Sequence, residues 1–409
     1  MIFGKKITKI SGSLNYLAWQ RFKKNKLSIS SLAFIIVAII VSVLGYLLTP
    51  DKTNFANSQL LEISTKQPGF RCTMLKTLKN ENINKKGGFH KMIWGKKDPF
   101  KYIPINSYYF ENHKLIIEEF NDVEGEDPFY TEINPIDVIA KIKYGTKQSY
   151  DRGIFTYINI EGKTQHISLK EVKHKISEKH IVKKRFALGT DRFGRDLFSR
   201  LLIGTRISLS VGFISVFISL LIGISLGAIA GYYKGVVDNV IMWLINVIWS
   251  IPTLLMVIAI TLVIGKGFWQ IFIAVGLTMW VEVARVVRGQ VLSIREKEYV
   301  EAARALGYSN FRIIFRHILP NILSPVIIIS AANFATAILL EAGLSFLGIG
   351  VQPPVPSWGT MIKEHYGYII MDKAYLAIYP GLAIMLMVLA FTLIGNGLRD
   401  ALDTKDSNS

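Results

Sequence analysis

Long runs without a single charged residue constrain this chain more than any other feature of its sequence. Four such runs cover residues 27–48, 207–233, 240–265 and 374–398. A helix needs about 20 predominantly apolar residues to cross the hydrocarbon core of a membrane. Within that core a helix also satisfies its own backbone hydrogen bonds. We therefore predict that each run is a transmembrane helix.

Two further apolar stretches carry a few charged residues. Residues 268–287 include Glu282 and Arg285, and residues 321–345 include Glu341. One charge at the middle of a helix raises the free energy of insertion by roughly 3 kcal/mol, whereas each Leu, Ile, Phe or Val lowers it by about 0.3–0.6 kcal/mol. Since apolar residues outnumber the charges, both stretches are predicted to insert. The expected fold is an all-α polytopic membrane protein with six transmembrane helices.

Two residues within the predicted spans are candidates for a gate or hinge. Pro252 interrupts the third span, and proline bends a helix because it lacks a backbone donor. We interpret it either as a packing kink or as a hinge for alternating access. Glu341 lies near the end of the fifth span. It could pair with a basic residue of a partner chain, or be hydrated at the outer boundary.

The distribution of basic residues predicts the side of the membrane on which each segment lies. Residues 1–26 hold no acidic residue and seven basic ones: Lys5, Lys6, Lys9, Arg21, Lys23, Lys24 and Lys26. Cytoplasmic flanks of transmembrane helices are enriched in Lys and Arg, so the N-terminus is predicted to be cytoplasmic. Six spans then place the basic loop 288–320 and the tail 399–409 in the cytoplasm too. The net charge of +18 is thus accounted for without a nucleic-acid partner.

Residues 49–206 separate the first span, residues 27–48, from the remaining transmembrane region, residues 207–398, and are expected on the outer side. Apolar and polar residues alternate over residues 153–160, a pattern typical of a β-strand. We expect an inserted α+β or mostly β module here. Its single cysteine, Cys72, cannot form an intrachain disulfide. The sequence has no nucleophile elbow, HExxH or paired-cysteine motif, and we predict no catalytic residue, cofactor or metal on this chain.

The stretch before the second span mixes apolar and charged residues. Leu197, Leu201 and Leu202 alternate with Arg195 and Arg200. Such a pattern is typical of an amphipathic helix that lies in the membrane interface. We interpret it as a structural anchor on the outer face, or alternatively as a contact with a soluble binding protein or a substrate gate.

The segment between the fourth and fifth spans has the pattern of a docking element. Apolar residues recur at helical spacing, at Tyr299, Ala302, Ala303 and Leu306. This spacing makes one helix face apolar, and Gly307 follows as a helix stop. A second short helix over residues 310–318 is expected to bring together Phe311, Ile314, Phe315 and Ile318. Such a helix–turn–helix, ended by Pro320, can dock on a soluble partner through its apolar face.

Three stretches together resemble the permease subunits of ABC-type importers, in particular the "C"-type permeases for dipeptides and oligopeptides. Residues 301–320 are similar to the EAA coupling loop of that family, with Glu301-Ala302-Ala303, Gly307 and Ile318-Leu319-Pro320. Residues 188–209 resemble the segment before the second span, and residues 341–359 resemble the segment after the fifth. The resemblance covers residues 15–50 and 186–403, and the segment 51–185 departs from it.

The resemblance implies a heteromeric importer. Its other components would be a second permease subunit, two ATP-binding subunits that hold ATP and Mg²⁺, and an extracytoplasmic solute-binding protein, with membrane lipid around the spans. The coupling loop is implied to contact an ATPase subunit through Tyr299, Glu301, Ala302, Ala303, Arg304, Leu306, Gly307 and Pro320. Glu301 would either stabilise its helix N-terminus or touch the ATPase directly. The chain has no GxxxxGK[ST] phosphate loop, in agreement with ATP hydrolysis by a partner.

The implied cargo is an oligopeptide or dipeptide, moved inward across the bacterial plasma (inner) membrane. Importers of nickel and of peptide antibiotics share the same motifs and are alternatives. An ion-coupled carrier or a channel is the alternative from another class. A proton-coupled carrier usually needs a charged relay at mid-membrane depth, and the predicted spans contain no such series of residues.

Overall fold

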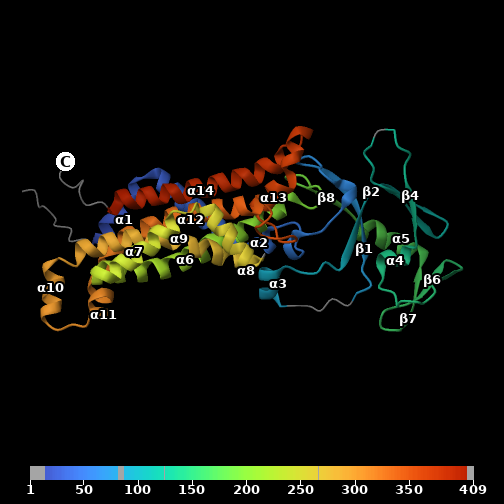
Figure 1. The fold of residues 1–409 in the computed structure, drawn as a ribbon. Coiled ribbons are helices and arrows are strands. Elements are labelled where there is room, and N and C mark those ends of the chain that lie inside the picture. Colours follow the sequence, from blue (N-terminus) through green and yellow to red (C-terminus); the bar gives the residue numbers. More distant parts are fainter. Residues whose placement is uncertain (1–13, 82–86, 124, 266, 403–409) are drawn as a thin grey trace, which may run out of the picture.

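The computed structural model describes residues 14–81, 87–123, 125–265 and 267–402. It consists of an elongated helix bundle with a β module at one end (Figure 1). Three of the basic N-terminal residues, Lys5, Lys6 and Lys9, and most of the tail 399–409 lie outside the described residues. The helix bundle and the module confirm the predicted fold class.

Within the described residues, five helices are long and apolar enough to cross a membrane, and a bent helix pair makes a sixth span if it is taken as one. The five are α2 (Lys26–Leu48), α6 (Leu197–Tyr233), α9 (Phe268–Ile294), α12 (Leu323–Phe346) with the turns before it, and α14 (Tyr375–Leu402). The bundle also contains α1 (Leu14–Lys24) and α13 (Trp358–His365). Asn25 caps α2 by accepting hydrogen bonds from the backbone N–H groups of Leu27 and Ser28.

The third predicted span is broken rather than continuous. Helices α7 (Gly235–Trp249) and α8 (Thr253–Ile264) meet at an angle of 92°. Pro252 precedes the first residue of α8, and its ring prevents α7 from continuing through this point. The predicted bend at Pro252 is confirmed, and it breaks the predicted span over residues 240–265 into two helices.

Helices α6 and α9 pack at the centre of the bundle through small residues. A side-chain carbon on Gly227 would lie 2.5 Å from the carbonyl oxygen of Ala284, and one on Gly223 would lie 2.5 Å from Cβ of Val283. No real side chain tolerates such distances. Because lipid gives no hydrophobic drive for association, close backbone approach of this kind holds membrane helices together.

The module inserted between α2 and α6 is an α+β unit with two antiparallel sheets. The five-stranded sheet has the order β4 (Tyr130–Ile133), β3 (Lys114–Glu119), β2 (Phe100–Glu111), β1 (Arg71–Leu78) and β8 (Ile181–Arg185). The three-stranded sheet is β5 (Ser149–Asp151), β6 (Ile154–Ile158) and β7 (Thr164–Ser168). Strand β6 confirms the strand predicted from the alternation over residues 153–160.

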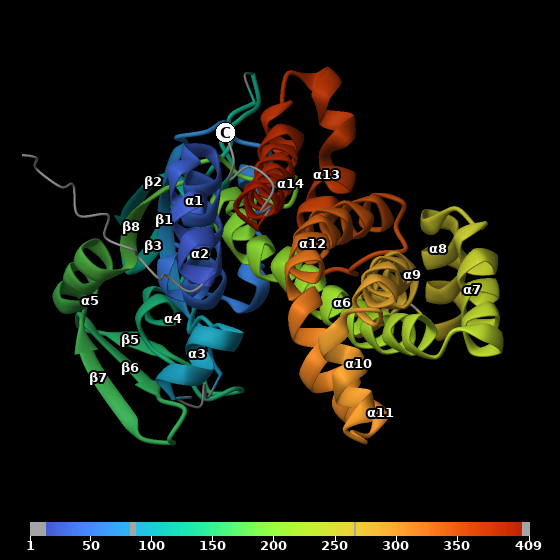
Figure 2. The same ribbon diagram turned by 90° about the vertical axis from the view of Figure 1, so that its left-hand side faces the viewer.

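The core of the module lies between its sheets and two short helices, α4 (Pro135–Ile139) and α5 (Leu169–Lys175). Leu115, Ile117, Ile136 and Val172 are fully buried there. A further helix, α3 (Gly88–Trp94), lies against the end of α2 (Figure 2). Strand β8 then leads back through residues 186–196 into α6, so the module is attached to the bundle at both of its ends.

Candidate functional site

The segment between α9 and α12 forms a compact protrusion at the end of the bundle opposite the β module (Figure 1). It contains α10 (Glu298–Ala305), α11 (Asn310–Arg312), a π-helical segment (Ile313–Ile318) and a 3₁₀ turn (Leu319–Ile322). We call residues 298–322 the elbow. The structure confirms that this segment is a helix–turn–helix, as predicted from its apolar spacing.

Gly307 shapes the turn of the elbow. Its φ of +75° lies in the left-handed region, where glycine has no steric penalty. The backbone N–H of Gly307 donates to the carbonyl of Arg304 at 3.0 Å, and that of Tyr308 donates to Ala303 at 3.2 Å. This pair of bonds is the Schellman motif, which satisfies the last carbonyl groups of a helix. The predicted helix stop at Gly307 is confirmed.

The inner side of the elbow is fixed to the bundle. Val300, Ile313 and Ile318 are fully buried and pack in one cluster with residues of α6 and α9. The hydroxyl of Tyr232, near the end of α6, donates a 2.8 Å hydrogen bond to Oδ1 of Asn310. Both helices of the elbow are therefore packed against the membrane helices.

Large apolar side chains are exposed to solvent on both helices of the elbow, and we refer to them together as the apolar patch. Its large members are Tyr299, Leu306, Phe311 and Phe315, with exposed fractions of 45%, 72%, 70% and 55%. The rings of Phe311 and Phe315 lie with their centroids 4.2 Å apart. Exposed aromatic and aliphatic side chains gathered on a rigid element are typical of a protein docking surface.

In each helix of the elbow, the predicted apolar residues differ in their burial. Ala303 is buried, whereas Tyr299, Ala302 and Leu306 of the same predicted face are exposed. In the second helix Ile314 and Ile318 are buried and the two phenylalanines are exposed. Each predicted apolar group is thus partly buried against the bundle and partly exposed to solvent. The elbow has an apolar side toward the bundle and a second apolar side toward solvent.

The remaining predicted contact residues are accessible on the elbow. Glu301, Arg304 and Pro320 are all exposed. The guanidinium of Arg304 lies 5.8 Å from the ring centroid of Tyr232. Glu301 lies in the first turn of α10, where a negative charge stabilises a helix, and its carboxylate is also free to meet another chain.

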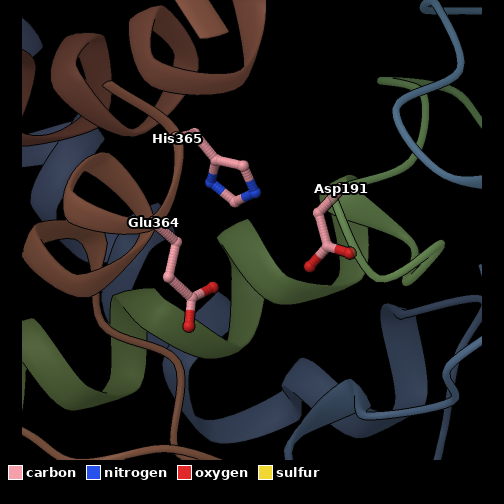
Figure 3. Close-up of side chains that lie close together, drawn as sticks. All are labelled: Asp191, Glu364 and His365. Carbon is pink, nitrogen blue, oxygen red and sulfur yellow. The ribbon is translucent and has the colours of Figure 1, made fainter. Parts of the chain in front are cut away.

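A second polar constellation lies at the opposite end of the bundle, where the β module joins α6. Figure 3 shows Asp191 beside Glu364 and His365 of α13. Nε of Arg195 is 2.5 Å from Oδ2 of Asp191, and its Nη2 is 2.8 Å from Oε2 of Glu364. Arg200, with only 2% of its surface exposed, lies beside the same two carboxylates. We call these five residues the charge clamp.

The charge clamp contradicts the predicted amphipathic interfacial helix. Arg195 and Arg200 are buried rather than facing solvent, and Leu197 is already the first residue of α6. Asp196 caps that helix by accepting a 2.9 Å hydrogen bond from the N–H of Ser199. The prediction failed because the carboxylate of Glu364, which comes from α13, offers the arginines a buried partner that local spacing does not reveal.

Ligand atoms of Asp191, Glu364 and His365 lie within 4.8 Å of one another, as they would around a metal ion. The two guanidinium groups, however, already balance the two carboxylates, so the arrangement fits an ion-pair network. His365 is fully buried, and burial lowers its pKa. Its Nδ1 lies 2.7 Å from the carbonyl oxygen of Met361 and its Nε2 lies 3.5 Å from the N–H of Arg192. A neutral imidazole, donating at Nδ1 and accepting at Nε2, satisfies both contacts.

Comparison with known proteins gives two family matches. Residues 223–406 match the family described as binding-protein-dependent transport system inner membrane component. Residues 13–68 match the N-terminal transmembrane domain of oligopeptide transport permease C. The glutathione transport system permease protein of Pectobacterium atrosepticum is 44% identical over 218 residues, which are 53% of this chain and 72% of that protein. The chain belongs to the family of binding-protein-dependent inner membrane transport components. It is thus the permease subunit of an ABC importer.

Other relatives of the permease are known. The dipeptide transport system permease protein of Alkalihalophilus pseudofirmus is 45% identical over 217 residues, or 53% of this chain and 71% of that protein. A solved structure of the MetNI methionine ABC transporter, in an inward-facing conformation, shares 21% identity over 49% of this chain and 96% of that chain, with a TM-score of 0.40. Residues 69–222, which include the eight strands of the described module, lie between the two family matches.

The permease encloses Glu341 completely. This residue of α12 has no exposed surface, and Oγ of Ser345 donates a 2.7 Å hydrogen bond to its Oε1. Both interpretations of Glu341 offered above require an accessible carboxylate, so neither fits this structure. The sequence was misleading because Glu341 lies near the end of a span, yet the segment after α12 folds back over this residue. Ser345, which binds Glu341, also contacts Ser357, the N-cap of α13.

Proposed function

We propose that this permease imports short peptides and that its elbow docks on a separate ATPase subunit. The observation that carries the docking is the apolar patch of Tyr299, Leu306, Phe311 and Phe315 on an element whose inner side is fixed to the bundle. If the patch lay on a flexible loop, movement of a bound partner would rearrange the loop and would not reach the membrane helices. A patch on a fixed elbow transmits that motion to the membrane helices.

The path of transmission is short. Buried Val300 and Ile313 hold the elbow against Val287 and Val291 of α9. The chain enters the elbow from α9 and leaves it into α12, so closure of two ATP-loaded partner subunits would displace both helices together. ATP and Mg²⁺ would be held by those partners, and substrate movement would require no covalent chemistry on this chain.

The proposed orientation places the elbow and both chain ends in the cytoplasm. The elbow and its flank carry Arg295, Lys297, Arg304, Arg312 and Arg316. Helix α1 lies at the same end of the bundle as α10 (Figure 1), and its last turn contains Arg21, Lys23 and Lys24. Basic residues on one side of the spans favour the cytoplasmic side. The β module would then lie outside, next to a second permease and a solute-binding protein.

Peptide cargo is supported by the relatives, one named for glutathione transport and another for dipeptide transport. Both cargoes are small peptides with free ammonium and carboxylate groups. In vesicles that contain the complete transporter, the expected result is saturable, ATP-dependent uptake of labelled Ala-Ala that other dipeptides compete for. Uptake of Ni²⁺ without uptake of dipeptides would contradict the peptide assignment. Uptake without any ATPase would favour a carrier or channel.

The docking role is tested by placing a charge in the patch. Leu306→Glu and Phe311→Glu should each weaken binding of the ATPase by about 2 kcal/mol or more, roughly thirtyfold, because buried interface anchors contribute that much. The matched control is Phe89→Glu, at a residue of the β module that is 73% exposed. Co-purification of the ATPase with the permease is the measurement. Full retention of the ATPase by both patch variants would exclude the elbow as the docking surface.

A further inference from the structure

An unpaired carboxylate lies on the most enclosed membrane helix. In α9, 67% of the most apolar stretch is buried, against 22–39% for the other four single-helix spans. Glu282, in the middle of this helix, is nevertheless exposed. Among the described residues its carboxylate has no hydrogen-bond or ion-pair partner. An ionised group at membrane depth is costly unless it meets water or an opposite charge.

The nearest cation on the same helix does not neutralise Glu282. A glutamate and an arginine three residues apart normally face each other. Here the guanidinium of Arg285 instead lies 3.5 Å from the ring centroid of Trp249, on α7. Its Nη2 is 3.4 Å from Oδ1 of Asn246, also on α7. Arg285 is therefore held by α7, and the negative charge of Glu282 is left available.

Glu282 also borders a small cavity at the break between α7 and α8. The cavity has a volume of about 90 Å³, and its lining includes Trp249, Thr253, Thr278 and Thr336 besides Glu282. Trp249, Ile251 and Thr253 of the lining lie at the break itself, where α8 turns away from α7 by 92°. The space holds a terminal group of a ligand but not a whole peptide.

We propose that Glu282 and this cavity form a cargo subsite that binds the primary ammonium group of the transported peptide. The peptide class rests on the function proposed above. A single carboxylate with threonine hydroxyls suits an ammonium ion, whereas the cavity lining holds no His or Cys and only one carboxylate for a metal ion.

The test measures cargo at the cavity directly. In the complete transporter with Cys72→Ser, Thr336→Cys provides a thiol in the cavity lining, and Leu339→Cys provides a control thiol that is exposed on the same helix outside the lining. During turnover, Ala-Ala should slow maleimide labelling of Thr336→Cys and leave Leu339→Cys unchanged. Acetyl-Ala-Ala, which lacks the ammonium, should protect about tenfold to a hundredfold less effectively, as expected for the loss of a charged hydrogen bond.

A second variant assigns that protection to Glu282. Glu282→Gln keeps the shape of the side chain and should shift the concentration of Ala-Ala needed for protection upward by about tenfold or more. Equal protection with glutamate or glutamine, or equal protection by the acetylated peptide, would overturn the proposal. The proposal would also be overturned if the Glu282→Gln variant lost the second permease subunit during purification. That result would show that Glu282 forms an ion pair with the second subunit. Uptake of Ala-Ala is measured first in the Cys72→Ser transporter, which keeps Thr336 and Glu282. If uptake is absent the proposed function fails, and if uptake is present without protection only this subsite fails.

Discussion

The hydroxyl of Tyr232 donates a hydrogen bond to Oδ1 of Asn310, so the last turn of α6 is joined to the second helix of the elbow. This contact links two segments that are far apart in the sequence. The carbonyl of Tyr232 also accepts from Nη1 of Arg295, just before the elbow. The end of α6 thus holds the elbow at both its entrance and its turn.

Removing the hydroxyl of Tyr232 should loosen the elbow without unfolding the permease. Tyr232→Phe leaves Oδ1 of Asn310 without its donor and should cost about 1 kcal/mol of local stability. Faster amide hydrogen exchange over residues 298–318 is the expected result. Tyr233→Phe, which removes a hydroxyl from a half-exposed neighbour, should leave exchange unchanged. Identical exchange in both variants would show that the bond does not hold the elbow.

A β-branched residue at the turn of the elbow should uncouple transport from ATP hydrolysis. Gly307→Val places a branched side chain at φ +75°, a strain of roughly 1–3 kcal/mol. The strain is relieved if the turn opens and displaces Leu306 from the docking patch. The ratio of peptide imported to ATP hydrolysed should fall while the protein remains in the membrane. Gly289→Ala, in the interior of α9 with open space around it, should keep a normal ratio.

Breaking the charge clamp should destabilise the permease strongly. Arg195→Met leaves the carboxylates of Asp191 and Glu364 without their closest cation. An uncompensated buried charge costs about 3–5 kcal/mol, and thermal denaturation in detergent should show a large drop in the midpoint. Arg192→Met removes an exposed arginine from the same loop and should have little effect. A midpoint that falls equally in both variants would argue against a stabilising clamp.

His365 predicts acid sensitivity of the same region. Burial lowers the pKa of its imidazole from the ordinary 6.5, so the unfolded state binds a proton more readily than the folded state does. Stability from this residue is therefore complete above about pH 6.5 and decreases as the pH falls below that value. The denaturation midpoint should fall between pH 7.5 and 5.5 by more in the natural protein than in His365→Gln. An equal fall would assign the acid sensitivity to other groups.

The features of the fold that depend on local sequence pattern could be predicted from the sequence. Uncharged runs identify the helices, Gly307 identifies the turn, and Pro252 identifies the bend. The 92° angle at that bend could not be predicted, because a proline indicates where a helix breaks and not the direction of the helix that follows, here α8, which contacts α9. Burial of Arg200 depends on Glu364, and burial of Val300 rather than Tyr299 depends on Tyr232 and α9. In each case the partner is distant in the chain, and spacing within one helix does not reveal it.

Helix α6 runs without interruption from Leu197 to Tyr233. At 1.5 Å per residue its length is about 55 Å, compared with roughly 30 Å for the hydrocarbon core. Its first turn is held in the charge clamp beside the β module, and its last turn is held in the elbow. Because one continuous helix joins these two ends, a displacement of the β module and a displacement of the elbow would both move α6.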